Sequence, residues 1–303
     1  MTKKELKTDG VTLGWMPGWL YDGLIKCFTH GNEKKLRQEM LDIVNVQRGD
    51  KVLDIGCGTG TLAILAADRA LVGATSGTRS TKSNTDDDEK QGLVVGVDPG
   101  YNLLKRAEKK ARKHYVNKRT MTDVPPTLEF RQGLAEAIPA DSDTFDVVLF
   151  TFTLHHLPGD DLQNRVLNEI KRVMVPGGRL LIVDFAGGHN GHHGHHKSQQ
   201  VVNVDTDPAA IAARKAKFEN VEVQKVEMMG AVAVLAKKPM SKGAFLASLK
   251  SNVIMGEKEQ QRASKGQVVA SMESDLIMGK DDDPEHKKLS KGEYLASLPS
   301  EVM

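Results

Sequence analysis

The stretch Val52-Leu-Asp-Ile-Gly-Cys-Gly-Thr-Gly60 predicts the fold of the whole chain. Apolar residues flank an aspartate, glycines then occupy every second position, and an apolar run begins at residue 62. This order is typical of a buried strand, a tight loop and the start of a helix. Glycine permits positive φ and a close approach to backbone, and a helix N-terminus favours an anion. The loop therefore predicts a site for a carboxylate or phosphate group.

A second strand is expected over residues 93–97, ending at Asp98. Residues 73–92 are rich in Gly, Ser, Thr and charge, which predicts a flexible surface insertion. Without that insertion Gly60 and Asp98 are 18 positions apart. A spacing of ~20 is typical of an acidic side chain that hydrogen-bonds ribose hydroxyls. The alternative is a turn aspartate before Pro99.

Composition sets the broad class. The chain has 303 residues and a formal net charge of +2, which suits one sizeable α/β domain plus an appendage and predicts no nucleic-acid surface. Two cysteines make a disulfide framework unexpected. No stretch reaches the ~18 apolar residues of a membrane span, and the N-terminus lacks a signal-peptide core. We therefore expect a cytoplasmic protein.

Residues 1–50 are expected to form a helical lid or cap that contains Trp15, Trp19 and Tyr21, with one helical pattern over residues 24–44. Two interpretations stay open for the aromatic residues, which either cover a bound substrate or pin this segment to the core. Residues 102–114 predict an amphipathic helix with a strongly basic face. Such a face is usually solvated, and an anionic membrane or an acidic partner is the less common alternative.

Later segments carry a family resemblance. Residues 132–139, 142–148 and 172–184 follow the glycine loop in the order found in class I S-adenosylmethionine-dependent methyltransferases, and Asp-Ile-Gly-Cys-Gly-Thr-Gly resembles their first motif. The Leu-His-His-Leu run at 154–157 is similar to the ubiquinone and menaquinone biosynthesis enzymes. The resemblance covers residues 51–239. It implies an α/β, Rossmann-like three-layer sandwich with a mostly parallel seven-stranded sheet.

The resemblance also implies a cofactor, S-adenosyl-L-methionine, with its amino-acid end on the glycine loop, its ribose at Asp98 and its adenine beside Leu134 and Ala135. Leu134 stands where many relatives have an aspartate that contacts the adenine amino group. The residues implied to hold the cofactor are Asp54, Gly56, Cys57, Gly58, Gly60, Asp98, Pro99, Leu134, Ala135, Glu136 and Thr151.

The predicted function is methyl transfer to an O, N, S or C atom of a small hydrophobic or lipid-like acceptor. An acceptor that must lose a proton needs a base, for which His155, His156 and Tyr21 are the candidates. Neighbours on an extended segment point to opposite sides, so at most one of the two histidines is expected to face the pocket. A purely structural role for both is the alternative.

The predicted methyl transfer does not account for two further segments. Residues 187–197 hold five histidines but lack cysteine or carboxylate partners at zinc-like spacing, so we expect a solvated loop and no metal. Residues 240–303 contain three similar units that begin at Ser241, Ser264 and Ser290. These units predict either short docking motifs for a protein partner or an irregular, loosely helical tail.

Two other functions stay open. A nicotinamide-binding oxidoreductase would account for the strand, the loop and Asp98, but usually has Gly-x-Gly-x-x-Gly spacing. A catalytically silent methyltransferase-like scaffold would account for Leu134 and the C-terminal units.

Overall fold

The computed structural model describes residues 6, 8–11, 16–70, 92–115, 127–185, 205–226 and 230–240. The chain divides into two compact units, Met1–Ser241 and Lys242–Met303, and the fold below is that of the first. Three predicted segments lie outside the described residues: the insertion 73–92 except Gly92, the His-rich loop 187–197, and the C-terminal tail except Met240.

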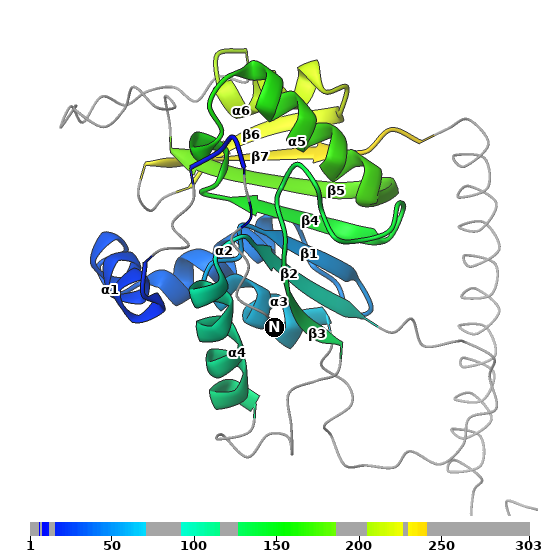
Figure 1. Cartoon of the computed structure of the whole chain (residues 1–303). Coiled ribbons are helices and arrows are strands. Elements are labelled where there is room, and N and C mark those ends of the chain that lie inside the picture. Colours follow the sequence, from blue (N-terminus) through cyan, green and yellow to red (C-terminus); the bar gives the residue numbers. More distant parts are fainter. Residues whose placement is uncertain are drawn as a thin grey trace, which may run out of the picture. The chain divides into compact units, whose positions relative to one another are not determined.

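Seven strands form one sheet in the order β3-β2-β1-β4-β5-β7-β6 (Figure 1). Strands β1 to β5 pair in parallel, and β7 runs antiparallel to both β5 and β6. The predicted mostly parallel sheet is therefore confirmed. The strands are β1 Lys51–Ile55, β2 Leu93–Asp98, β3 Leu128–Gln132, β4 Phe145–Thr151, β5 Met174–Phe185, β6 Glu219–Lys225 and β7 Ala231–Lys237.

Strand order reverses between β1 and β4, because the chain builds outward from β1 to β3 and then returns to the other side of β1. Open α/β sheets bind ligands beyond the carboxyl ends of their strands at such a reversal. The glycine loop follows β1 directly, so the topology places the loop at this point.

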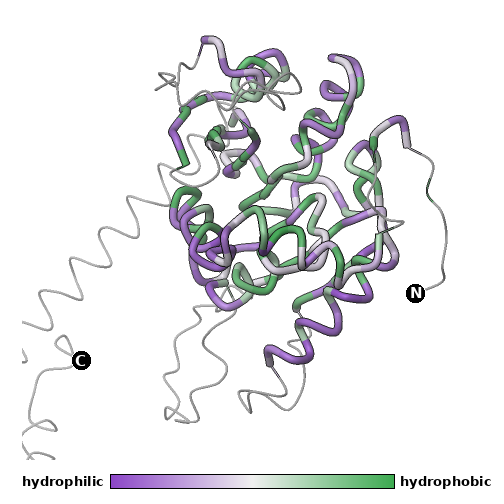
Figure 2. Tube along the Cα trace, turned by 90° about the vertical axis from the view of Figure 1, so that its left-hand side faces the viewer, coloured by the Kyte–Doolittle hydropathy of each residue, from purple (hydrophilic) through white to green (hydrophobic). Residues whose placement is uncertain are grey.

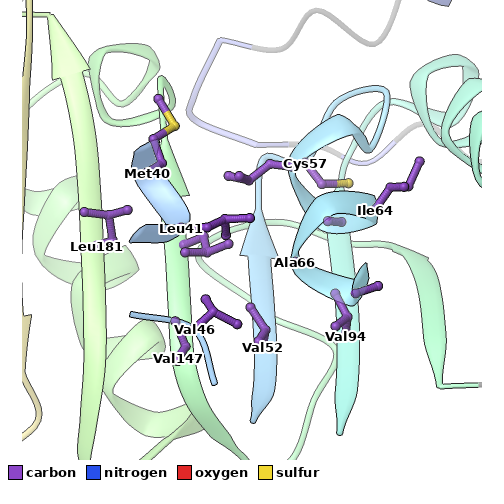
Figure 3. Packing of buried hydrophobic residues seen from close by; sticks show 14 of the residues in the cluster. Met40, Leu41, Val46, Val52, Cys57, Ile64, Ala66, Val94, Val147 and Leu181 are labelled. Carbon is purple, nitrogen blue, oxygen red and sulfur yellow. The ribbon is translucent and has the colours of Figure 1, made fainter. Parts of the chain in front are cut away.

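Helices cover both faces of the sheet and make three layers (Figure 1). Adjacent strand residues such as Val52 and Leu53 point to opposite faces, and each enters a different apolar cluster. Figure 3 shows the cluster beneath α2 and α3, where Leu41, Val52 and Val147 are buried. One face packs against α2 Glu33–Ile43, α3 Thr61–Ala70 and α4 Tyr101–Tyr115, and the other against α5 Asp160–Val173 and α6 Pro208–Lys215. Hydropathy follows this arrangement, with hydrophilic residues along much of α4 (Figure 2).

The single helix expected over residues 24–44 is wrong in one respect, because the segment forms two helices, α1 Gly18–Phe28 and α2. Gly31 ends the first helix with a φ of 80°, and its amide donates to the carbonyl of Lys26 over 2.8 Å. Glycine in the left-handed region is a common helix terminator. In the described part of the chain, no helix is both long and apolar enough to cross a membrane.

Gly60 shows why the loop needs glycine for packing as well as for backbone conformation. Its φ is 75°, and an added Cβ would lie 2.7 Å from both Ala107 and Phe130. These contacts come from α4 and β3, so Gly60 joins the loop to the body of the domain.

We expect Gly60→Ala to lower the free energy of unfolding by about 1–3 kcal/mol, because it combines overpacking with backbone strain. Urea denaturation measures this change. Gly23→Ala is the matched control: it lies inside α1 with nothing within 4 Å of an added Cβ. This control should be neutral or stabilising by up to about 1 kcal/mol. Equal midpoints for Gly60→Ala and the unchanged protein would contradict the packing role.

Candidate active site

The loop that follows β1 is fastened to the end of β2. The amides of Gly56 and Cys57 donate to the carbonyl of Val97 over 2.8 and 3.1 Å. The carboxylate of Asp98 accepts from the amide of Gly58 at 2.9 Å and from that of Gly100 at 2.7 Å. Gly56, Gly58 and Gly60 all have positive φ, which explains the alternating glycines. The loop is thus a fixed backbone surface at the reversal of strand order.

Burial raises the pKa of Asp98 to about 6, although the Gly100 and Gly58 amides act in the opposite direction. Near neutral pH the carboxylate is therefore mostly ionised. Each of its oxygens already accepts one amide, but a carboxylate oxygen can accept more than one hydrogen bond. Asp98 can still accept ribose hydroxyls in the predicted way, and that role stays a prediction.

A small cavity opens beside the loop. Its wall contains six of the predicted site residues: Gly56, Pro99, Leu134, Ala135, Glu136 and His156. The other lining residues are Thr8, Gly10, Val11, Ile55, Val97, Gly133, Thr153 and Leu157. Residues from the ends of β1, β2, β3 and β4 therefore meet around one space.

Residues 8–11 form one wall of the cavity, which sequence reasoning did not anticipate. The Thr8 hydroxyl donates to Glu136 Oε1 over 2.6 Å, and the Val11 amide donates to the carbonyl of His156 over 2.9 Å. These two contacts hold the segment against loops from opposite sides of the cavity. Residues 8–11 have no distinctive composition, and only the folded backbone brings them here.

Helix α1 covers the glycine loop. The Tyr21 ring lies against Gly58, where an added Cβ would be 3.1 Å from the tyrosine hydroxyl. Asp22 accepts from the Thr59 hydroxyl over 2.7 Å. Burial raises the pKa of Tyr21 to about 12, so this phenol is a poor base near neutral pH. The structure thus places Tyr21 at the loop, while its predicted catalytic role stays untested.

A buried pair of opposite charges lies behind the loop. Asp54 is 1% exposed and Arg37, from α2, is 9% exposed. Arg37 donates from a terminal nitrogen to the Thr151 hydroxyl over 3.3 Å, and its Nε lies 3.8 Å from Glu33. Yet Arg37 Nε and Asp54 Oδ2 are the two buried side-chain polar atoms in the described residues that lack a hydrogen-bond partner. Burial raises the pKa of Asp54 to about 7, and the positive charge of Arg37 partly opposes that rise.

The two candidate histidines differ. His155 donates through its backbone amide to Asp184 Oδ2 over 3.0 Å, and its Nδ1 lies 2.8 Å from Asp184 Oδ1. His156 lines the cavity. One of the two histidines therefore lines the cavity, in keeping with the expectation of at most one. The extended backbone on which that expectation was based is wrong. They lie on a short 3-10 turn, Leu154–His156, with ring centroids 4.0 Å apart, and not on an extended strand.

The remaining predicted residues lie around the cavity and do not line it. Cys57 is buried, and burial raises the pKa of its thiol. Thr151 is reached by Arg37, and Gly60 faces α4. In the described part of the chain no group of three or more His, Cys, Asp or Glu residues could hold a metal ion.

Sequence reasoning missed Arg37, although a signal was present. Leu36, Met40 and Leu41 follow helical spacing, and residue 37 belongs to the same face because residues four apart on a helix are neighbours. Its neighbours Lys34 and Lys35 are exposed, so composition alone does not distinguish the buried cation.

Comparison with known proteins identifies the family. A model described as a methyltransferase domain matches residues 47–206. Demethylmenaquinone methyltransferase of Bacillus subtilis is 30% identical over 164 residues, which cover 54% of this chain and 58% of the relative. The ubiquinone/menaquinone biosynthesis C-methyltransferase of Escherichia coli is 30% identical over 166 residues, or 55% of each chain. The chain therefore spans little more than half the length of these curated relatives.

A solved structure shows the same fold. The SAM-dependent methyltransferase from Aquifex aeolicus is 21% identical, with a TM-score of 0.50 over 71% of this chain and 97% of that chain. At this identity the likeness concerns the fold alone. The family model, however, covers more than half of the chain and includes the glycine loop, Asp98 and the two histidines. The chain belongs to the class I S-adenosylmethionine-dependent methyltransferases.

Proposed function

We propose that this chain transfers the methyl group of S-adenosylmethionine to a ring carbon of a small hydrophobic quinol. The observation that carries the cofactor half of this proposal is the buried pair of Asp54 and Arg37, each with an unsatisfied polar atom. Buried polar groups without protein partners are costly, so two at one site favour the binding of a polar ligand there.

The chemistry of the pair matches the amino-acid end of the cofactor. An amino acid carries an ammonium group and a carboxylate on one carbon, and here a carboxylate and a guanidinium lie behind the same loop. We assign the ammonium to Asp54 and the carboxylate to Arg37. Charge-assisted hydrogen bonds of this kind are about twice as strong as neutral ones. When bound, S-adenosylmethionine supplies an activated methyl group.

A cluster of aromatic rings beside the cavity-lining His156 supports a flat, hydrophobic acceptor. Phe152 and Phe185 lie at the ends of β4 and β5 with ring centroids 5.2 Å apart, and the His155 ring lies 5.3 Å from Phe185. Aromatic rings favour an aromatic partner. The names of two curated relatives refer to menaquinone or ubiquinone biosynthesis, which points to the quinol class.

We propose His155 as the base: it does not line the cavity itself, but its ring lies 4.0 Å from that of His156, which does. The tautomer that donates Nδ1–H to Asp184 carries its lone pair on Nε2, the atom that can accept a proton. Removal of the quinol hydroxyl proton makes the ring carbons more nucleophilic, and the new carbon–carbon bond forms as the sulfur–methyl bond breaks. The methylated carbon then loses its ring proton and the oxygen regains one, which restores the aromatic quinol. Asp184 is 7% exposed and holds the backbone and the ring of His155 in place.

The cofactor assignment predicts a selective loss of affinity in Arg37→Met. Affinity for S-adenosylhomocysteine should fall at least ~30-fold, because one partner of a buried charge contact is removed. Affinity for 5′-methylthioadenosine, which lacks the amino-acid end, should stay unchanged. Calorimetric titration measures both, and Arg37→Lys is the charge-preserving control that should recover part of the loss. Equal losses for the two ligands would show that Arg37 is structural.

The acceptor assignment predicts that His155→Gln lowers the rate of methyl transfer to demethylmenaquinol by about 10²–10⁴-fold, the usual contribution of a positioned base. Cofactor affinity should not change. His114→Gln is a matched control, because His114 also contacts a carboxylate, at 2.9 Å from Asp68 on the surface helix α4. Its rate should equal that of the unchanged protein.

Three results would count against the acceptor assignment or its base. Full activity in His155→Gln would remove that residue from the reaction. Transfer to an oxygen of the quinol would overturn the carbon assignment. Cofactor binding without transfer to any quinol would favour the catalytically silent scaffold.

A further inference from the structure

Helix α1 carries an exposed apolar stripe. The described part of the chain has five exposed large hydrophobic residues, and four of them, Trp19, Leu20, Leu24 and Phe28, belong to this one helix. Trp19 is 69% exposed and Phe28 is 62% exposed. Leu20, Leu24 and Phe28 are four residues apart and therefore line up along the helix, and Trp19 lies beside Leu20 at the start of the same exposed side. We call these four residues the α1 stripe.

The α1 stripe cannot turn inward, because the other side of α1 is fixed to the domain. Asp22 accepts from Arg106 Nε over 2.7 Å and from Lys110 Nζ over 3.1 Å, both on α4. Gly18 packs so closely on Arg106 that an added Cβ would lie 2.6 Å from it. The exposure of the stripe is therefore a property of the folded domain.

Basic residues are exposed on α1 itself and on the helices α2 and α4. Lys26 is exposed on α1 itself, and Lys34 and Lys35 are exposed at the start of α2. On the neighbouring helix α4, Lys105, Lys109, Arg112 and Lys113 are exposed, whereas Glu108 is its single exposed acidic residue. Helix α4 therefore carries a local excess of positive charge, whereas on α2 the basic residues are balanced by Glu33, Glu39 and Asp42.

We propose that the α1 stripe and these basic residues form a docking surface for an anionic lipid bilayer. A helix with bulky apolar residues on one side and lysines beside them lies in the headgroup region of a membrane, where Trp is also favoured. Each Lys or Arg near an anionic surface adds an electrostatic attraction, which salt weakens. An exposed helix side with basic residues on neighbouring helices fits a flat anionic surface. It fits less well to a partner protein that binds through a pocket.

Docking in this orientation would bring the active site close to the lipid. The inner side of α1 contacts the glycine loop through Tyr21 and Asp22, so the loop would lie about one helix diameter, roughly 10–12 Å, from the headgroups. A hydrophobic acceptor could then reach the site directly from the bilayer. Lipid binding itself does not depend on methyl transfer, so its test can fail or succeed independently of the proposed function.

The test is co-sedimentation of the full chain with vesicles. We expect binding to equal parts of phosphatidylcholine and phosphatidylserine, and none to phosphatidylcholine alone. The double variant Trp19→Ser, Phe28→Ser should bind at least ~10-fold more weakly, because it removes the two most exposed apolar side chains of the stripe. Lys109→Glu should also weaken binding, whereas the matched control Lys225→Glu, on the strand β6 at one edge of the sheet, should not.

Fluorescence reports the contact directly. The chain has two tryptophans, so Trp15→Phe leaves Trp19 as the sole emitter. Its emission should shift to the blue when anionic vesicles are added. Absence of vesicle binding, or equal binding by the double variant, would overturn the proposal. A dimer in vesicle-free buffer that dissociates in the double variant would also overturn it, because the stripe would then face a second copy of the chain.

Discussion

The arrangement of the rest of the site depends on the buried charges behind the glycine loop. Asp54 and Asp98 end two adjacent parallel strands, and Arg37 reaches the same region from α2. Burying an ion without full hydrogen bonding is expensive, so the surrounding fold must hold these groups in place. Asp98 satisfies its oxygens with loop amides and thereby fixes the loop. Asp54 and Arg37 retain unsatisfied atoms, which makes them the part of the site suited to a zwitterionic ligand.

The fold could be predicted from the sequence because the residues that indicate it are contiguous in the chain. Strand β1, the loop and α3 are contiguous, and Asp98 could be assigned once the polar stretch before it was set aside. Leu134 and Ala135 line the cavity, and their contact with adenine stays a prediction. Contacts between distant segments were harder to foresee. Thr8 meets Glu136 across 128 positions and Arg37 meets Thr151 across 114, and no local pattern encodes such pairs. The turn at His155 and His156 was also missed, because a strand that ends early resembles one that continues.

Helix α1 links the two proposals. Its inner side touches the glycine loop at Gly58 and Thr59, and its outer side exposes the α1 stripe. The expected lid therefore has two distinct surfaces. One surface meets the loop and the other remains available to a membrane, so a hydrophobic acceptor and a polar cofactor could approach from different directions.

The most direct test of the central claim is the proton exchange that accompanies cofactor binding. An ammonium beside Asp54 favours the carboxylate form and lowers its pKa from about 7, so binding at pH 6.5 should release roughly three-quarters of a proton. Calorimetric titration with S-adenosylmethionine in two buffers of different ionisation enthalpy measures this number. We predict saturable binding with proton release, and much less release in Asp54→Asn. Binding without proton release, or no binding, would contradict the assignment of the amino-acid end to Asp54 and Arg37.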